Sequence, residues 1–203
     1  MSAATYPEFA DRIAEHTGSV VLTFNFRGTG TSEGEFSFAG WRSDLRAAVG
    51  ILCERAGVDS PVCVGSSLGG SVALVCAADD TRIGGVATLG SPTEGLWSRD
   101  PDAFLAHARK VGAVHSDAFP SDNAAWTRDA RSLDPIAAAR SLGSRPLLVL
   151  QGSEDDVVPM DDARALAEAG GERAELHVVY EAGHQLRHDP RAVAVLLGWL
   201  DRV

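Results

Sequence analysis

Gly65-Ser66-Ser67-Leu68-Gly69 follows an apolar run at residues 61–64 and opens a segment of mostly small residues at 70–78. These surroundings predict a strand, a sharp turn and a helix, with Ser67 at the apex of the turn and its hydroxyl in solvent. We expect Gly65 and Gly69 to be required sterically, because a strand and a helix that meet at a tight angle leave no room for side chains. The stretch therefore indicates an exposed serine between a strand and a helix.

A serine in this position is a candidate nucleophile. The Leu68 amide begins the helix, so it would lie beside an oxygen bound near Ser67, where the positive end of the helix dipole favours negative charge. Such a serine also needs a base to take its proton. A glycine- and serine-rich loop without chemistry would contain the same five residues, so the rest of the chain has to distinguish the two interpretations.

On both sides of this stretch, strand patterns alternate with helix patterns. Strands are predicted at residues 19–26, 61–64, 84–90, 145–151 and 175–181, and the first is apolar enough to be buried on both faces. A first helix opens at Thr5 or Tyr6 and ends at Gly18, and further helical patterns occupy residues 41–56, 68–78, 163–169 and 193–200. This alternation predicts an α/β fold with an open, mostly parallel sheet and helices on both faces. Sites in such folds form beyond the carboxyl ends of the strands.

Length and composition predict a single domain that spans residues 1–203. Apolar residues make up 45% of the chain, which is enough for one well-buried core. The net charge of -10 is spread along the chain and argues against nucleic acid or an anionic membrane as a partner. Because neither a signal peptide nor a run of about eighteen apolar residues is visible, we expect a cytoplasmic protein.

Neither the glycine-rich loop nor the cysteines have the spacing that a cofactor or metal site needs. The loop at residues 27–34 has three glycines, but their spacing is G-x-G-x-x-x-G and no helix opens at them, so a dinucleotide site is rejected. Cys53, Cys63 and Cys76 have neither the number nor the spacing of a disulfide framework or a zinc site, and we expect buried, reduced thiols. No metal and no organic cofactor are predicted.

Residues 92–132 interrupt the alternation and are too many for a plain connection between strands. We expect short helices that form a cap. Trp97, Phe104, Phe119 and Trp126 would either line an acyl or aryl pocket or hold the insertion on the core. The sequence does not distinguish these two roles.

Acidic residues and a histidine follow two later strands, as Ser67 follows an earlier one. Glu154, Asp155 and Asp156 come after the strand at 145–151, and His184 comes after the strand at 175–181. His184 could act as general base for Ser67 while a carboxylate holds its other ring nitrogen. All three acids lie in the same loop after the strand, so their position alone does not show which of them would contact His184.

Two other histidines are rivals of His184. His188 lies at the start of a predicted helix, where we expect a surface or capping role. His177 lies within a predicted strand, where we expect a structural role.

Together these landmarks resemble the α/β-hydrolase superfamily. They are Arg27-Gly28-x-Gly30-x-Ser32, Gly65-x-Ser67-x-Gly69, Gly152-x-x-Asp155-x-x-Val158-Pro159 and Gly183-His184, in the usual order across most of the chain. The chain is most similar to small bacterial serine hydrolases of the dienelactone-hydrolase-like and serine-aminopeptidase-like groups. The resemblance implies Ser67 as nucleophile, His184 as base and Asp155 as orienting acid, with Asp156 as the alternative acid. Dienelactone hydrolases use cysteine as nucleophile, so their specific activity is not implied.

The chain departs from the family pattern at its N-terminus. Family members have a strand before the first helix, usually ending in His-Gly, whose loop supplies the second oxyanion amide. Here only residues 1–4 stand in that place. In the family's sheet that strand lies between those corresponding to residues 19–26 and 61–64, so either these two pair directly or something else fills the gap. A start codon assigned too far downstream would also account for the difference.

Three functions remain as hypotheses. The first is a serine hydrolase that cleaves a small acyl ester through an acyl-enzyme at Ser67. The second is a non-catalytic α/β-hydrolase-like protein that binds a small molecule or a partner and has an incomplete oxyanion hole. The third is a truncated fragment that associates through its open edge. Esters, thioesters, amides and lactones use the same triad chemistry, so the sequence predicts neither the particular substrate nor the oligomeric state.

Overall fold

The computed structural model describes residues 6–203, with the backbone alone for Leu96. Its sheet has four parallel strands in the order β1-β2-β3-β4. The strands are β1 (Val62–Ser66), β2 (Gly85–Leu89), β3 (Leu147–Gly152) and β4 (Ala174–Val179). The helices are α1 (Tyr6–Thr17), α2 (Phe38–Ala56), α3 (Leu68–Asp79), α4 (Leu96–Arg99), α5 (Pro101–Lys110), α6 (Asn123–Arg131), α7 (Pro135–Arg140), α8 (Met160–Gly170) and α9 (Pro190–Leu200), with 3-10 turns η1 (Gly171–Arg173) and η2 (Leu186–His188). The predicted α/β fold with an open parallel sheet is confirmed.

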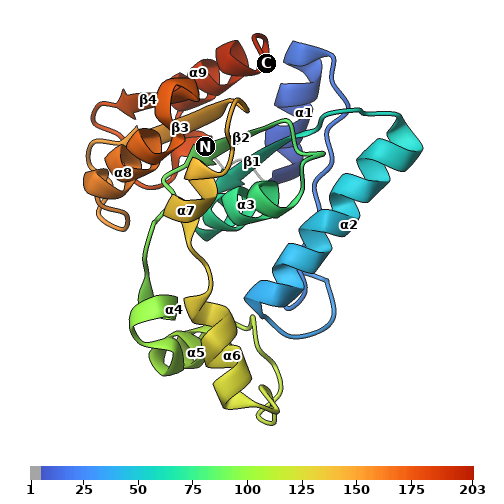
Figure 1. Ribbon diagram of the computed structural model, residues 1–203, viewed down its shortest axis with the longest axis vertical. Coiled ribbons are helices and arrows are strands. Elements are labelled where there is room, and N and C mark those ends of the chain that lie inside the picture. Colours follow the sequence, from blue (N-terminus) through green and yellow to red (C-terminus); the bar gives the residue numbers. More distant parts are fainter. Residues whose placement is uncertain (1–5) are drawn as a thin grey trace.

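Alternating side chains along the strands divide the core into two layers. In β3, Leu147 and Val149 belong to a cluster with buried residues of α2, α3, α7 and α8. Leu148 and Leu150 belong instead to a cluster with residues of α1 and α9. Because successive side chains of a strand point to opposite faces, this division places helices on both faces of the sheet, as predicted (Figure 1).

The strand predicted at residues 19–26 is wrong. This segment has no regular structure, and residues 20–24 make no backbone hydrogen bond with any residue from 6 to 203. It does not pair with β1, which is the edge of the described sheet. Strand propensity alone does not make a strand, because the backbone groups need a neighbour to bind. The alternative helix start at Thr5 and the question of a strand in residues 1–4 lie outside the described residues.

The helix predicted from residue 41 begins earlier, at Phe38. Ser37 caps it, since its hydroxyl accepts a hydrogen bond from the Gly40 amide at 3.0 Å. The Asp129 carboxylate of α6 accepts a second first-turn amide, that of Ala39, at 2.9 Å. Gly57 ends the helix with φ 67°, as predicted.

Residues 92–132 contain α4, α5 and α6, which lie together at one end of the molecule (Figure 1). Of the two roles left open for the aromatic residues of this segment, the packing supports the structural one. Trp97 and Trp126 are only 4% and 5% exposed. The Phe104 ring stacks against Phe38 and Trp126, and the Trp97 ring packs against Phe38. These contacts hold the three helices against the start of α2.

The three cysteines are free thiols. Cys76 is buried, whereas Cys53 and Cys63 keep some exposed surface, so the expected burial is right for Cys76 only. Loss of hydration raises the pKa of the Cys63 thiol to about 12, although that residue is only partly covered, and the pKa of the Cys76 thiol to about 11. Both thiols are therefore protonated at neutral pH and are poor nucleophiles.

No helix within residues 6–203 is both long and apolar enough to cross a membrane.

Candidate active site

Ser67 is the single residue between the end of β1 and the start of α3. Its backbone has φ 52° and ψ -132°, a region that residues other than glycine rarely adopt. Two hydrogen bonds of 2.9 Å hold this turn, from the Ser67 amide to the Leu89 carbonyl and from the Gly70 amide to the Ser67 carbonyl. The Ser67 hydroxyl does not cap α3. Strain of this kind is on the order of 1–3 kcal/mol and is typical of functional sites.

Steric contacts near Ser67 require glycine at positions 65 and 70, whereas the sequence predicted positions 65 and 69. A Cβ atom on Gly65 would lie 2.5 Å from the Gly70 backbone, so the requirement at Gly65 is as predicted. A Cβ on Gly69 would meet no atom within 4 Å, so the steric requirement expected there is wrong for the structure as described. Gly70 is the second restricted position, because a Cβ there would overlap the Ser91 hydroxyl. The crossing of strand and helix is thus closest at Gly65 and Gly70.

Asp155 and His184 come together from the loops after β3 and β4. The Asp155 Oδ2 atom lies 3.0 Å from His184 Nδ1. The Asp155 side chain is completely buried, and the His184 side chain is 15% exposed. The Asp155 Oδ1 atom accepts the amides of Val157 and Val158, each at 2.9 Å. The carboxylate is therefore fixed on one side by backbone donors and on the other by the imidazole.

The Asp155 carboxylate is stabilised in its ionised form. Burial by itself raises its pKa, because charge is unfavourable away from water. Hydrogen bonds from the Val158 amide, the His184 ring and the Val157 amide act in the opposite direction and outweigh burial, so the pKa lies below the usual value. An ionised carboxylate at this place can orient the histidine and stabilise its protonated form.

Gly90 connects the Ser67 turn with the Asp155–His184 pair. The Ser67 amide binds the carbonyl of Leu89, the residue just before Gly90. A Cβ on Gly90 would lie 3.1 Å from Asp155 Oδ2 and 3.3 Å from His184 Nδ1. The three loops therefore meet at the carboxyl ends of the strands. Within residues 6–203, the Ser67 hydroxyl and the His184 Nε2 atom make no hydrogen bond to each other.

The rival residues lie in other surroundings. Glu154 and Asp156 are exposed, so the fold distinguishes Asp155 from both neighbours by burial and by its contact with His184. His177 is a residue of β4, where its Nε2 lies 3.4 Å from Glu175. The capping role expected as one option for His188 is wrong, because the residue that caps α9 is Asp189. His188 instead has a buried Nδ1 atom without a partner among the described residues.

Gln151 is a site residue that the sequence interpretation missed. It is completely buried in β3, and its Nε2 donates to Asp155 Oδ2 at 3.1 Å and to the Val158 carbonyl at 2.9 Å. The available signal was a polar side chain at the end of an otherwise apolar strand. Buried polar groups need partners, and the Nε2 group finds them in the Asp155 carboxylate and the Val158 carbonyl, whereas the buried Oε1 atom has no partner among the described residues.

A cavity of about 510 Å³ lies beside Ser67, with Ser67 and Leu68 in its wall. Most of its remaining lining is apolar and includes Phe24, Phe26 and Trp41. None of the four aromatic residues of 92–132 borders it, which is a second reason to assign them a packing role. Among residues 6–203, no group of three or more His, Cys, Asp or Glu side chains is arranged to hold a metal ion.

Comparison with known proteins agrees with this architecture. Residues 1–196 match the alpha/beta hydrolase family, and the chain therefore belongs to that family. Two uncharacterized proteins of Mycobacterium tuberculosis, from strains CDC 1551 and H37Rv, are each 32% identical to it over 169 residues, covering 82% of this chain and 53% of theirs. The chain thus spans about half the length of these curated relatives.

Solved structures of hydrolases share the fold. Alpha/beta hydrolase GrgF from Penicillium sp. sh18 matches with a TM-score of 0.76 and 19% identity, over 98% of this chain and 83% of that one. An esterase from Pyrococcus furiosus matches with a TM-score of 0.68 and 20% identity, over 97% and 73%. The esterase domain of a Rhodothermus marinus protein matches with a TM-score of 0.67 and 21% identity, over 99% and 82%. Similarity to the dienelactone-hydrolase-like and serine-aminopeptidase-like groups in particular stays a prediction.

Proposed function

We propose that this chain is a serine hydrolase that cleaves a small acyl ester through a covalent acyl-enzyme at Ser67. The observation that carries the proposal is the buried Asp155–His184 pair, which lies against Gly90 beside the strained Ser67 turn. Family membership supports hydrolytic chemistry, and the names of two structural neighbours mention esterases. The Ser67, His184 and Asp155 side chains act as nucleophile, general base and orienting acid.

In the first half of the reaction, His184 Nε2 takes the proton of the Ser67 hydroxyl as the serine oxygen bonds to the ester carbonyl carbon. Asp155, hydrogen-bonded to Nδ1, keeps the ring in place and stabilises the imidazolium. The tetrahedral intermediate then breaks its bond to the alkoxy oxygen, which leaves as an alcohol with the proton from His184. In the second half, His184 activates a water molecule that cleaves the acyl–Ser67 ester and releases the carboxylic acid.

The amide of Leu68 is the proposed donor to the oxyanion. It occupies the first position of α3, where a helix amide has no acceptor within the helix. The dipole of this twelve-residue helix adds positive potential at the same end. The Gly70 amide is already bound to the Ser67 carbonyl. Loss of one oxyanion donor slows acyl transfer by about a hundredfold to a thousandfold where it has been tested by mutagenesis, so the Leu68 amide is expected to matter strongly.

Labelling and burst kinetics test the proposal. We expect a fluorophosphonate probe to label the wild-type chain at Ser67, and a p-nitrophenyl ester to give burst release of nitrophenolate. Ser67→Ala and His184→Ala should abolish both signals, and Asp155→Asn should reduce turnover by roughly 10⁴. Asp156→Asn and His188→Gln are matched controls, since they change a neighbouring acid and a neighbouring histidine and should retain activity.

A folded wild-type chain that neither reacts with the probe nor hydrolyses the ester would contradict the proposal. Thermal stabilisation by a small molecule, without turnover in the wild type or in Ser67→Ala, would favour the non-catalytic binding protein instead.

A further inference from the structure

The loop that follows β2 lies against the acid–base pair of the candidate active site, and we call residues 90–93 the β2 loop. Its first residue is Gly90, whose backbone has φ 58°. A Cβ on Gly90 would lie 3.1 Å from Asp155 Oδ2 and 3.3 Å from His184 Nδ1. Because protein interiors are close-packed, a shift of Gly90 would change the space in which these two side chains meet.

On one side the β2 loop is fixed to α3, the helix that begins directly after Ser67. The Ser71 hydroxyl is completely buried and donates to the Pro92 carbonyl at 2.6 Å. Ser91 packs against the first turn of the same helix, where a Cβ on Gly70 would overlap its hydroxyl. These contacts hold the loop at a fixed place relative to the nucleophile turn.

On the other side the β2 loop is fixed to α8 through Asp162. The Asp162 Oδ2 atom accepts the Thr93 amide at 2.9 Å. Asp162 lies in the first turn of α8, and its own amide donates to the Pro159 carbonyl at 3.1 Å. Pro159 directly follows Val158, whose amide donates to Asp155 Oδ1 at 2.9 Å. The contacts therefore form a closed ring, from Asp155 through its own loop to Asp162 and back along the β2 loop to the same carboxylate.

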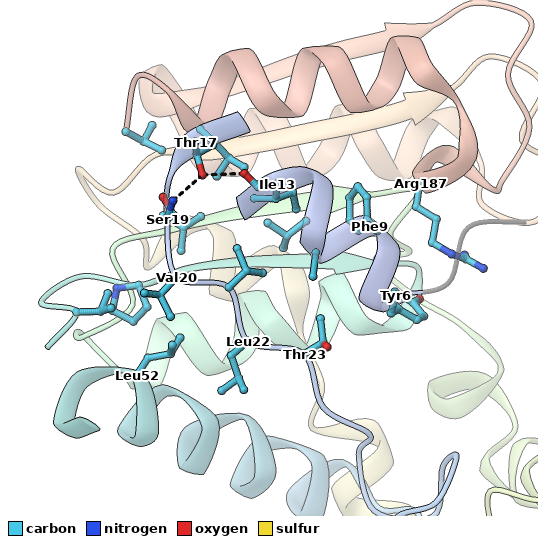
Figure 2. A pocket seen from close by; sticks show the side chains of 18 of the residues that line it. Tyr6, Phe9, Ile13, Thr17, Ser19, Val20, Leu22, Thr23, Leu52 and Arg187 are labelled. Carbon is cyan, nitrogen blue, oxygen red and sulfur yellow. Dashed lines mark hydrogen bonds between the residues drawn. The ribbon is translucent and has the colours of Figure 1, made fainter. Parts of the chain in front are cut away.

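The β2 loop is packed against protein and borders neither of the two cavities near β1. One cavity, of about 300 Å³, lies between α1 and residues 19–23 (Figure 2). Residues 90–93 line neither this cavity nor the one of about 510 Å³ beside Ser67. Gly90 and Ser91 are also buried. The loop is therefore placed to act through the residues that it contacts.

We propose that Asp162 and Ser71 are positioning residues for the proposed reaction. Each holds the backbone of the β2 loop, and the loop in turn keeps the Asp155–His184 pair at a fixed place beside the nucleophile. Both side chains act through the loop, so neither is a catalytic residue. This inference rests on the proposed function and adds to it two residues outside the triad.

Kinetics of variants at two neighbouring carboxylates test the proposal. Asp162→Ala removes the acceptor of the Thr93 amide, and we expect kcat for the p-nitrophenyl ester to fall by about tenfold to a hundredfold while KM changes by less than about twofold. Asp162→Asn keeps an oxygen that can accept the amide, so it should retain most of the wild-type kcat.

Asp161→Ala is the matched control for Asp162→Ala. Asp161 lies in the same turn of α8 and has the same charge near the positive end of the helix dipole. Its side chain is 86% exposed and pairs with Arg164 on the same helix. We expect this variant to retain the wild-type kcat.

A readout that does not need turnover is the NMR signal of the His184 Nδ1 proton. Asp155 Oδ2 lies 3.0 Å from this ring nitrogen, so the hydrogen bond should slow exchange of the proton with water and give a resolved downfield signal. His184→Ala identifies the signal in the wild-type spectrum. We expect Asp162→Ala to broaden or remove it, and Asp162→Asn and Asp161→Ala to leave it unchanged.

Ser71 tests the other side of the loop, and serves alone if Asp162→Ala does not fold. Ser71→Ala removes the donor to the Pro92 carbonyl and should lower kcat by about tenfold with little change in KM. Thr88→Val is its matched control, because Thr88 is also completely buried and its hydroxyl donates to the Leu148 carbonyl within the sheet. This control should retain kcat.

The outcomes separate this inference from the proposed function. A folded wild-type chain that does not hydrolyse the ester contradicts the proposed function, and the proton signal then decides whether the loop positions the pair. If the wild type is active, an unchanged kcat and an unchanged proton signal in Asp162→Ala would overturn the inference, even with a loss of stability, because the bond would then only attach residues 92–132 to α8. Equal losses of kcat in Asp161→Ala and Asp162→Ala would also overturn it, since the charge at the helix end would then be the cause.

Discussion

Backbone geometry at the Ser67 turn gives neighbouring glycines opposite sensitivities. We expect Gly70→Ala to destabilise the protein, because its Cβ would overlap the Ser91 hydroxyl in a buried position. Gly69→Ala should be neutral or stabilising by up to about 1 kcal/mol, because Gly69 lies in α3 with open space beside it. Thermal unfolding of the two variants measures the difference. Equal destabilisation by both would contradict it.

Gln151 is expected to act on catalysis through Asp155. Replacing it with leucine removes the donor to Asp155 Oδ2 and to the Val158 carbonyl, so the carboxylate loses one support. We expect Gln151→Leu to lower kcat by about tenfold or more with little change in KM, because positioning affects the transition state more than substrate binding. Gln151→Glu should not restore the rate, since a second carboxylate would lie beside the first. A stability loss with unchanged kcat would assign Gln151 a purely structural role.

Stability should depend on pH through Asp155. Because its folded-state pKa is below the usual value, ionised Asp155 contributes stability above the unfolded pKa of about 3.9. That contribution is lost as the pH falls through the lower folded-state pKa. We therefore expect the stability difference between wild type and Asp155→Asn to shrink from pH 6 to about pH 3, measured by urea unfolding. Asp156→Asn, at an exposed site, should show no such trend.

At the scale of secondary-structure elements, Arg145 joins pieces that are distant in the sequence. Its guanidinium donates to the Ala77 carbonyl in α3 at 2.6 Å, to the Ile83 carbonyl before β2 at 3.1 Å, and to the Leu142 carbonyl after α7 at 3.1 Å. We expect Arg145→Ala to lower the free energy of unfolding by about 2–3 kcal/mol, because buried carbonyls lose a charged donor. Arg173→Ala is the control, since Arg173 makes one exposed bond to a carbonyl. Similar losses in both variants would contradict this role.

Within the described residues, the strands of the sheet differ in how many neighbours they pair with. β3 is paired with a strand on each side, and all of its residues are buried, so its apolar side chains are covered on both faces of the sheet. β1 carries the nucleophile turn at its end but is paired on one side only. The candidate active site therefore rests partly on the edge strand of the described sheet.

At the scale of the whole molecule, aromatic packing attaches α4, α5 and α6 to the rest of the chain. Trp126 of α6 is 5% exposed, packs against Phe104, and donates its indole N–H to the Phe36 carbonyl at 3.5 Å. We expect Trp126→Ala to destabilise the protein by about 3–5 kcal/mol, because it leaves a large cavity. Tyr180→Ala, at a site 74% exposed, should change stability by less than about 0.5 kcal/mol. Denaturant unfolding monitored by fluorescence compares them, and a near-neutral Trp126→Ala would show that the helices attach elsewhere.

Much of the fold and of the candidate site follows from local sequence. Apolar runs and helical periodicity predicted β1 to β4, α1, α3, α8 and α9, because these patterns report directly which face of an element is buried. The turn around Ser67 is also local, since a Cβ on Gly65 would meet the backbone of Gly69 and Gly70, which are only four and five residues away in the sequence. The loops that carry Asp155 and His184 follow from their places after strands. α7 was not predicted, because its six residues are too few to show a period.

The tertiary structure alone decided what depends on residues distant in the sequence. The place of the loop left Glu154, Asp155 and Asp156 equivalent and only the family resemblance favoured Asp155, whereas the structure shows the Asp155 carboxylate in contact with His184, because the two loops meet once β3 and β4 pair. It identified Gln151 as the support of that carboxylate. It also left residues 19–26 without a strand, since hydrogen bonds to a neighbour, and not the composition of a segment, make a strand. Sequence patterns thus determined the class of fold and the loops that carry the site residues. The pairing of strands distant in the sequence decided which side-chain atoms of those loops come into contact.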